Sequence, residues 1–461
     1  MHRVRGVFFL ATGLLILVVT LLTYHRVRAA TLIVPDDYPT IQAAINAASP
    51  GDTVLVRTGT YSENLTLDKP IVLTAEVYDP SDPTRNTTII DGGPSSPAAT
   101  IAIPTGVSPM PTIRGFVIRN GNDGVLDRSE FIVEYNYFVQ AGDQIDYEAG
   151  GGGINRHNVY FNAADDAIDL DNMTRLLLIE NNRMMYSRDD GIEIRLQGAS
   201  APAQPITITI RNNQIIGSDE DGIQLIDYPG QPDDTNRRFV ITGNLIANSR
   251  FAGIGLMPNQ NSVEDYSGAD IVEVIRVYHN TFHGNDYGIS GGDNLVAFNN
   301  IIANSTTRGV WRVQGQAGDN SAIAYTLFYS NTTHAEQSLL GAGNLFGSNP
   351  LFVSPPNPGP DSLWGTVDDD FSGLTLQGGS PAIDAGVTQY VASDGEAIPP
   401  TPISGFSGAA PDLGWREFMA PPDTPTPTAT PTPTHTPTRT GSETPTPTPT
   451  RDYTYLPIIH K

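Results

Sequence analysis

Between about residue 112 and residue 346 the chain repeats a two-part unit, and this repeat restricts the fold more than any other pattern. Each unit opens with a β-type run that ends in an Asn-containing turn, at Ile179-Glu180-Asn181-Asn182, Ile210-Arg211-Asn212-Asn213, Ile241-Thr242-Gly243-Asn244, Val277-Tyr278-His279-Asn280 and Ala297-Phe298-Asn299-Asn300. A second, alternating run follows, at Ala167-Ile168-Asp169-Leu170, Gly191-Ile192-Glu193-Ile194, Gly222-Ile223-Gln224-Leu225, Gly253-Ile254-Gly255-Leu256 and Gly288-Ile289-Ser290. Units of about 20 to 35 residues with alternate apolar side chains predict coils of a solenoid that stack through parallel strand ladders.

The competing architecture is an antiparallel sandwich or barrel. Its hairpin turns would recur at about 8 to 12 residues and would not keep this two-part order. The composition, with 45 Gly, 37 Pro and 16% charged residues, also disfavours a helical bundle. We therefore predict an all-β fold, a single parallel β-helix over residues 31–420, with an opening segment (31–111), coils (112–346) and a closing segment (347–420).

The N-terminal residues predict export and a cap for the solenoid. Basic Arg3 and Arg5 precede an apolar run from Val7 to Leu22, and small residues near Ala29 suit cleavage, so residues 1–29 are predicted to be a signal peptide. An uncleaved anchor is the alternative. Apolar residues at helical spacing in residues 38–48 predict a short helix that covers the open end of the stack.

The C-terminal composition changes abruptly. Residues 421–450 are dominated by alternating Thr and Pro, which favours polyproline II and predicts a disordered linker or stalk. Residues 451–461 form an apolar tail, which is either an attachment to the cell envelope or a disordered end.

Charge and cysteine content limit the partners. The formal net charge is -24, which disfavours nucleic acid as a partner. It also repels an acidic polysaccharide, unless divalent cations bridge the two. The absence of cysteine excludes disulfides, thiolate metal sites and a lipidated cysteine anchor. We expect a monomer.

Two stretches carry a family resemblance. Val34-Pro35-Asp36-Asp37-Tyr38-Pro39-Thr40-Ile41-Gln42-Ala43-Ala44-Ile45, with Gly51-Asp52-Thr53-Val54 and Gly59-Thr60-Tyr61, resembles the opening of pectate-lyase-superfamily right-handed parallel β-helices. The stretch from Gly379 to Gly386 and Pro411-Asp412-Leu413-Gly414 resemble the closing segment of secreted bacterial members. The resemblance covers roughly residues 31–418 and implies a right-handed β-helix outside the cell. It implies no single chemistry, because the superfamily contains lyases, hydrolases, epimerases and non-catalytic binders.

Acidic residues recur at one corner of four consecutive coils. They are Asp143 with Asp146, Asp165 and Asp166 with Asp169, Asp189 and Asp190 with Glu193, and Glu220 and Asp221 with Gln224. If Ile145, Ile168, Ile192 and Ile223 point inward, then Asp146, Asp169, Glu193 and Gln224 form one outward column. Carboxylates about 5 Å apart repel by roughly 3 kcal/mol at an effective dielectric near 20, so a cation is expected among them.

Calcium is the predicted cation, because it takes six to eight oxygen ligands in irregular geometry. The predicted metal ligands are Asp165, Asp166, Asp169, Asp189, Asp190 and Glu193. Asp165-Asp166-Ala167-Ile168-Asp169 resembles the Asp-Asp-x-x-Asp calcium cluster of one group of β-helical pectate lyases. The alternative is ordinary turn chemistry, in which solvated acids relax their repulsion through water and sodium.

A catalytic role needs a base in addition to a metal. The corresponding lyases use Lys, but the lysines here are Lys69 and Lys461, so Arg195 is the predicted substitute. Arginine is a poor base, because its pKa exceeds 12. For a polygalacturonase-like hydrolase, Asp166 and Asp190 are the predicted acid and base. Two classes of function remain open. The first is a non-catalytic surface protein that binds polysaccharide through Ca²⁺, which we favour, or that only provides a rigid displayed shaft. The second is an enzyme, either a Ca²⁺-dependent uronate lyase or a glycoside hydrolase.

Overall fold

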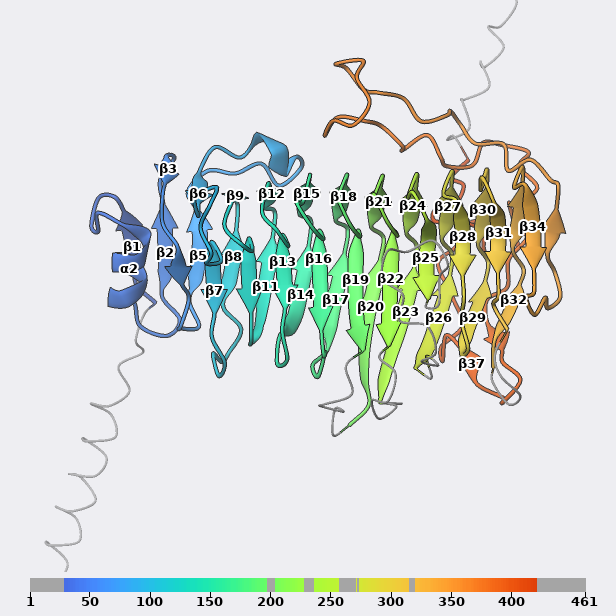
Figure 1. The fold of residues 1–461 in the computed structure, drawn as a ribbon, viewed down its shortest axis with the longest axis horizontal. Helices are drawn as coiled ribbons and strands as arrows, with labels where there is room; N and C mark the ends of the chain where they lie inside the picture. Colours follow the sequence, from blue (N-terminus) through green and yellow to red (C-terminus); the bar gives the residue numbers. More distant parts are fainter. Residues whose placement is uncertain are drawn as a thin grey trace, which may run out of the picture. The chain divides into compact units, whose positions relative to one another are not determined.

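The computed structural model describes residues 29–196, 204–227, 236–256, 271, 273–314 and 320–420 (Figure 1). Three long parallel sheets, here named A, B and C, stack strand on strand, and the chain visits them in the order C, A, B in each coil. The predicted parallel β-helix is therefore confirmed. The predicted signal peptide (apart from Ala29), linker and C-terminal tail lie outside the described residues.

The strands of the three sheets follow one another in sequence at regular intervals. Sheet A contains β1 (Thr31–Val34), β2 (Thr53–Val56), β5 (Val72–Ala75), β8 (Thr112–Arg114), β11 (Glu130–Glu134), β14 (Gly152–Arg156), β17 (Leu177–Glu180), β20 (Ile206–Arg211), β23 (Arg237–Thr242), β26 (Val274–Tyr278), β29 (Leu295–Phe298) and β32 (Ala322–Ala324). Sheet B contains β3 (Thr60–Tyr61), β6 (Ile89–Asp91), β9 (Val117–Arg119), β12 (Tyr137–Val139), β15 (Val159–Phe161), β18 (Arg183–Met185), β21 (Gln214–Ile216), β24 (Leu245–Ala247), β27 (Thr281–His283), β30 (Ile301–Ala303), β33 (Leu327–Tyr329) and β35 (Leu345–Phe346). Sheet C contains β4 (Leu65–Thr66), β7 (Ile101–Ile103), β10 (Val125–Asp127), β13 (Ile145–Tyr147), β16 (Ile168–Asp171), β19 (Ile192–Leu196), β22 (Ile223–Asp227), β25 (Ala252–Leu256), β28 (Tyr287–Ser290), β31 (Arg308–Trp311) and β34 (Thr333–Glu336). Parallel pairing already begins at β1, so the coils extend through the opening segment as well as residues 112–346.

The core is the interior of the coils. In one coil Ile168 and Leu170 of β16, Leu177 and Ile179 of β17, and Met184 of β18 are at most 2% exposed. Each such side chain contributes roughly 1.5–3 kcal/mol by its burial. Alternate residues therefore form the core, as the period-two pattern predicts.

The recurrent Gly before Ile has a steric cause. A Cβ on Gly191 would lie 2.3 Å from Ile215 Cγ2 and 2.5 Å from the carbonyl oxygen of Gly222. A Cβ on Gly222 would lie 2.4 Å from Ile246 Cγ2. Any side chain at these positions would push successive coils apart.

The predicted helix caps the N-terminal end of the stack, where Figure 1 shows it beside β1. Helix α2 (Ile41–Ala47) begins after Thr40, whose Oγ1 accepts the N–H of Ala43 at 3.1 Å, and it buries Ile41, Ala44 and Ile45. Within the described ranges, no helix has the length and apolar character needed to cross a bilayer.

The Asn turns form a ladder inside the corner between sheets A and B. Its members are Asn136, Asn158, Asn182, Asn213, Asn244, Asn280 and Asn300, all buried. Asn213 Oδ1 accepts the N–H of Asn182 at 2.9 Å, and its Nδ2 donates to the carbonyl oxygen of Ile179 at 3.0 Å. The preceding Asn212 adopts the left-handed conformation, with a φ of 56°. The Asn-containing turns of the repeat thus stack on one another from coil to coil.

Replacing Asn213 with alanine should lower the free energy of unfolding by about 2 kcal/mol. The substitution leaves the N–H of Asn182 and the carbonyl of Ile179 buried without their partner, and each unpaired group costs about 1 kcal/mol or more. Urea denaturation measures the loss. Asn212→Gly is the matched control, because Asn212 is exposed and glycine fits its backbone, and it should change the stability by less than about 0.5 kcal/mol.

The closing segment packs on the outside of the middle and last coils. Phe371, Leu374 and Trp415 pack against side chains of sheet B such as Met185 and Ile216. The antiparallel hairpin of β36 (Tyr390–Val391) and β37 (Ala397–Ile398) packs on sheet A, against a cluster that includes Phe298. A short 3₁₀ helix, η1 (Pro83–Arg85), lies in the loop between β5 and β6. The apolar clusters of the closing segment thus lie on sheets A and B, whereas the acidic residues lie on sheet C.

Candidate metal and polysaccharide site

A ladder of aspartates follows the corner between sheets B and C. Its members on five consecutive coils are Asp123, Asp143, Asp166, Asp190 and Asp221. The backbone N–H of Asp190 donates to Asp166 Oδ1 at 2.7 Å, and that of Asp221 donates to Asp190 Oδ1 at 2.6 Å. One oxygen of each of these two carboxylates is therefore bound to the next coil.

A second column of polar side chains lies on the outer face of sheet C. The strand register pairs Asp146 with Asp169, Asp169 with Glu193, and Glu193 with Gln224. The inward residues Ile145, Ile168, Ile192 and Ile223 are fully buried. The predicted register is confirmed. Asp169, Glu193 and Gln224 are only 2–3% exposed, however, so the column is much less solvated than an exposed turn.

Three carboxylates from the two columns converge. Asp166, Asp169 and Glu193 each offer an oxygen within 4.8 Å of the other two, and each is buried. Among the described residues this is the single such group. Burial, together with Asp190 and Glu193, raises the pKa of Asp166 well above its ordinary value. The group therefore strongly favours a bound proton or a bound cation.

Arg195 supplies one positive charge beside this group. Its Nη1 donates to Asp169 Oδ2 at 2.7 Å and lies 3.8 Å from Asp171 Oδ1, and its Nη2 pairs with Glu193. Burial alone would lower the pKa of Arg195, but the effect of these carboxylates is larger, and the pKa of Arg195 is raised above its ordinary value. Burial and nearby acids still raise the pKa of Asp169 to about 8 despite this partner. The single positive charge of Arg195 therefore does not neutralise the negative charge of the carboxylates around it.

Several buried carboxylate oxygens of this region have no hydrogen-bond donor. Among them are Asp146 Oδ1 and Asp169 Oδ1, on neighbouring coils. Burial, with Asp123 and Asp143, raises the pKa of Asp146 to about 8. An unpaired buried oxygen costs about 1–3 kcal/mol, and a carboxylate-rich donor set is the one that hard cations prefer. These residues therefore fit Ca²⁺.

The structure separates the predicted site residues into three sets. Asp166, Asp169 and Glu193 converge, and Arg195 pairs with two of them. Asp190 belongs to the ladder beside them. Asp165 is exposed and Asp189 is half-buried, and both lie outside the converging group.

Sequence reasoning missed two acids of this region as site residues. Asp171 is paired in register with Arg195, and Asp123 begins the ladder one coil before Asp143. The signal for Asp171 was its spacing of two from Asp169, which places both on one strand face. The signal for Asp123 was its position before Gly124 and Val125, which repeats the later Asp-Gly-Ile pattern.

The comparisons with known proteins give structural similarity alone. No family model and no curated protein matches the chain. The pectate lyase Pel9A is 17% identical, with 81% of this chain and 90% of that chain covered and a TM-score of 0.39. A GH87 alpha-1,3-glucanase from Streptomyces thermodiastaticus is 12% identical over 69% of this chain and 70% of that chain, with a TM-score of 0.43. The A-module of the mannuronan C-5 epimerase AlgE4 from Azotobacter vinelandii is 15% identical over 65% of this chain and 92% of that chain, with a TM-score of 0.34.

The fold assignment rests on the chain's own strand pairing. Three parallel sheets of eleven or twelve strands, an internal Asn ladder and an N-terminal capping helix together define the architecture. The chain is therefore a parallel β-helix.

Proposed function

We propose that this protein is an exported, cell-surface β-helix that binds an acidic polysaccharide through Ca²⁺ on the outer face of sheet C. The observation that supports the proposal is the convergence of Asp166, Asp169 and Glu193, with the buried oxygen Asp169 Oδ1 left without a donor. Asp166, Asp169 and Glu193 would hold the ion. When bound, it would supply positive charge and open coordination positions for a carboxylate of the polysaccharide.

The bridging ion resolves an electrostatic conflict. A chain with a formal net charge of -24 repels a polyuronate. Asp166, Asp169 and Glu193 with their partner Arg195, here called the acidic cluster, lie on the face where the polysaccharide would bind. Arg195 is the member of the cluster that reaches solvent, with 27% of its side chain exposed against 4% for Asp169. The polysaccharide therefore approaches the ion from the side of Arg195.

The same contacts favour binding over catalysis. Arg195 would have to lose a proton to act as a base, but its carboxylate partners stabilise the protonated form. Asp166 and Asp190 are 1% exposed, and each gives one oxygen to a backbone N–H of the next coil. An acid and base pair for hydrolysis must instead lie on either side of a glycosidic bond.

Export and attachment complete the proposal. The basic and apolar N-terminal run of residues 1–29 supports export, and the Thr/Pro-rich residues 421–450 with the tail 451–461 support display at the cell envelope. The roles proposed for these three segments rest on their amino-acid sequences.

Retention on polysaccharide gels tests the function. The protein should be retarded in gels containing polygalacturonate or alginate when Ca²⁺ is present, and it should migrate freely in EDTA. Asp169→Asn should lose retention, whereas the control Asp165→Asn, at an exposed neighbour, should keep it. Incubation with the same polymers should produce no absorbance at 235 nm and no new reducing ends. Retention that is unchanged in EDTA or in Asp169→Asn contradicts the calcium bridge, and product formation would establish a lyase or a hydrolase instead.

A further inference from the structure

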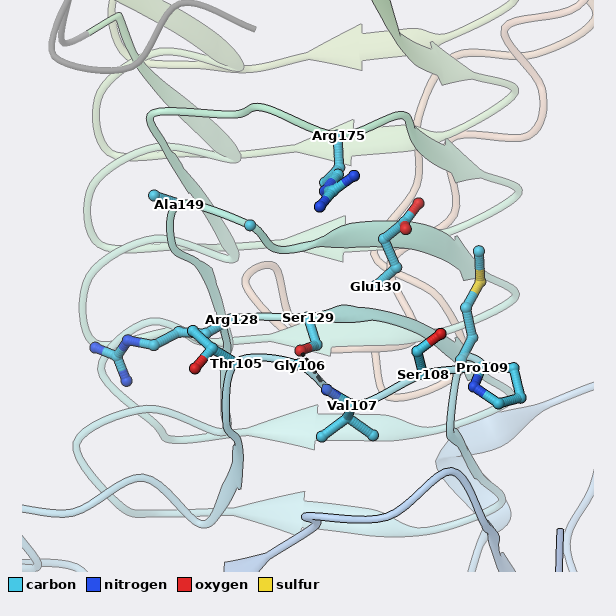
Figure 2. Close-up of a pocket in the computed structure, with 12 residues that line it drawn as sticks. Thr105, Gly106, Val107, Ser108, Pro109, Arg128, Ser129, Glu130, Ala149 and Arg175 are labelled. Atoms are coloured by element: carbon cyan, nitrogen blue, oxygen red, sulfur yellow. Dashed lines mark hydrogen bonds between the residues drawn. The ribbon is translucent and has the colours of Figure 1, made fainter. Parts of the chain in front are cut away.

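A hollow of about 590 Å³ lies at the corner between sheets C and A (Figure 2). Its walls come from four consecutive coils: the loop 105–110, the turn 128–130, the turn 149–150 and Arg175. At about 4.8 Å per coil the hollow spans roughly 14 Å along the β-helix axis. A cavity of this size is typical of small-molecule and sugar sites.

One buried carboxylate fixes two of these walls. Asp127 points into the coil and is fully buried, and its Oδ1 accepts the N–H of Ser129 at 3.0 Å while its Oδ2 accepts the N–H of Gly152 at 3.1 Å. Ser129 Oγ in turn donates to the carbonyl oxygen of Pro104 at 2.7 Å and accepts the N–H of Val107 at 3.1 Å. The loop 105–110 is thus tied to the next coil, and the hollow is formed before any ligand arrives.

The lining combines one available cation with hydroxyl groups and an apolar patch. Arg175 is exposed and takes part in none of the ion pairs of the described residues, and Figure 2 shows its guanidinium turned into the hollow. Arg128, by contrast, is paired with Glu148 at 2.8 Å. Thr105 and Ser108 add hydroxyl groups, while Pro109 and the 40% exposed Met110 add apolar surface.

This lining matches a uronate residue. A guanidinium binds a carboxylate through two parallel hydrogen bonds, hydroxyl groups and the Glu130 carboxylate can bind sugar hydroxyls, and an apolar patch suits the C–H face of a sugar ring. A neutral sugar would leave Arg175 without a partner.

A row of charged residues connects the hollow to the acidic cluster. The register pairs Arg195 with Asp171, and the residues that follow β13 and β10, Glu148 and Arg128, continue the same row. The row crosses three coil spacings, which is roughly 14 Å. A polymer that lies along the axis therefore contacts both the cluster and the hollow.

The geometry points to a second polysaccharide subsite, in which Arg175 binds a carboxylate of a uronate chain whose other residues lie at the acidic cluster. The inference depends on the proposed function, because the cluster anchors the same chain. It assigns to the hollow the selection of long, acidic chains over short or esterified ones.

Calorimetric titration with oligogalacturonates of two to eight residues, in Ca²⁺, tests the inference. Arg175→Gln should weaken binding of the longest oligomers roughly 10- to 100-fold and leave the shortest within about twofold, because only long chains reach both sites. Arg188→Gln, which removes an exposed arginine of the same coil at the opposite corner of sheet C, should leave every oligomer within about twofold.

The outcomes separate the two proposals. Failure of every oligomer to bind the unaltered protein overturns the proposed function. Normal binding of all lengths to Arg175→Gln overturns the subsite alone. Equal weakening at all lengths, or equal affinity of the unaltered protein for acidic and methyl-esterified octamers, also contradicts the subsite as described.

Discussion

Replacing Glu396 with alanine should destabilise the closing segment by about 3–5 kcal/mol. Glu396 Oε2 accepts from Arg276 Nη2 at 2.6 Å and from Arg276 Nε at 3.1 Å, and Arg276 is 1% exposed. Burial raises the pKa of Glu396, but hydrogen bonds from Arg276 and Arg238 bring this pKa below its ordinary value, so the group is ionised. Removing the carboxylate leaves a buried guanidinium without its counter-ion, which is the costly way to break such a pair.

Chemical denaturation followed by tryptophan fluorescence measures this loss, and limited proteolysis should show earlier cleavage within residues 347–420. Glu336→Ala is the matched control. Glu336 pairs with Arg308 at 2.6 Å, but both side chains are partly exposed, at 41% and 26%. An exposed pair contributes about 0–1 kcal/mol, so the control should change little. Equal losses of stability in the two variants would show that the buried Arg276–Glu396 pair contributes no more than an exposed ion pair.

In EDTA, the protein should become less stable as the pH rises from about 5 to about 8. Burial raises the pKa of Asp127 to about 8, and burial with nearby acids raises those of Asp146 and Asp169 to about 8. An acid whose pKa is higher in the folded state binds its proton more tightly there. The stabilisation is therefore present at low pH and is lost as the pH rises from the unfolded value towards the folded one.

Each such group contributes up to about 1.4 kcal/mol per pH unit, so the free energy of unfolding should fall by at least about 3 kcal/mol over this interval. Ca²⁺ at about 100 times its dissociation constant should restore roughly 2.7 kcal/mol at pH 8. It should restore little at pH 5, where protons occupy the carboxylates. Urea denaturation at several pH values, with and without Ca²⁺, measures both effects. A free energy of unfolding in EDTA that does not change between pH 5 and pH 8 would contradict the raised pKa values of these buried carboxyl groups.

The fold could be predicted from the sequence because each coil repeats its own local signals. Ile168 and Ile192 alternate with Asp169 and Glu193. In these coils the buried turn residue, such as Asn182 or Asn213, stands three positions after the last core residue of the sheet A strand. In a parallel stack, such periodic positions necessarily become vertical neighbours. The alignment of the acids therefore followed from the sequence alone.

The burial and pairing of the site could not be predicted in the same way. Arg195 pairs with Asp169 across 26 positions, and its choice among three carboxylates depends on side-chain conformation. Asp165 and Asp166 are neighbours in sequence, but one is exposed and the other buried, because the chain turns between them. The contact of Glu396 with Arg276 joins residues 120 positions apart and has no local signal. The hollow beside Arg175 likewise depends on loops from separate coils.

Calcium titration of the metal-free protein at pH 7.5, by isothermal calorimetry, tests the central claim most directly. The account predicts saturable binding of Ca²⁺ to the unaltered protein and to Asp165→Asn, and at least a tenfold weaker affinity in Asp169→Asn and in Glu193→Gln. Absence of Ca²⁺ binding to the folded, unaltered protein, or equal affinity in all four proteins, would contradict the assignment of a cation to the outer face of sheet C.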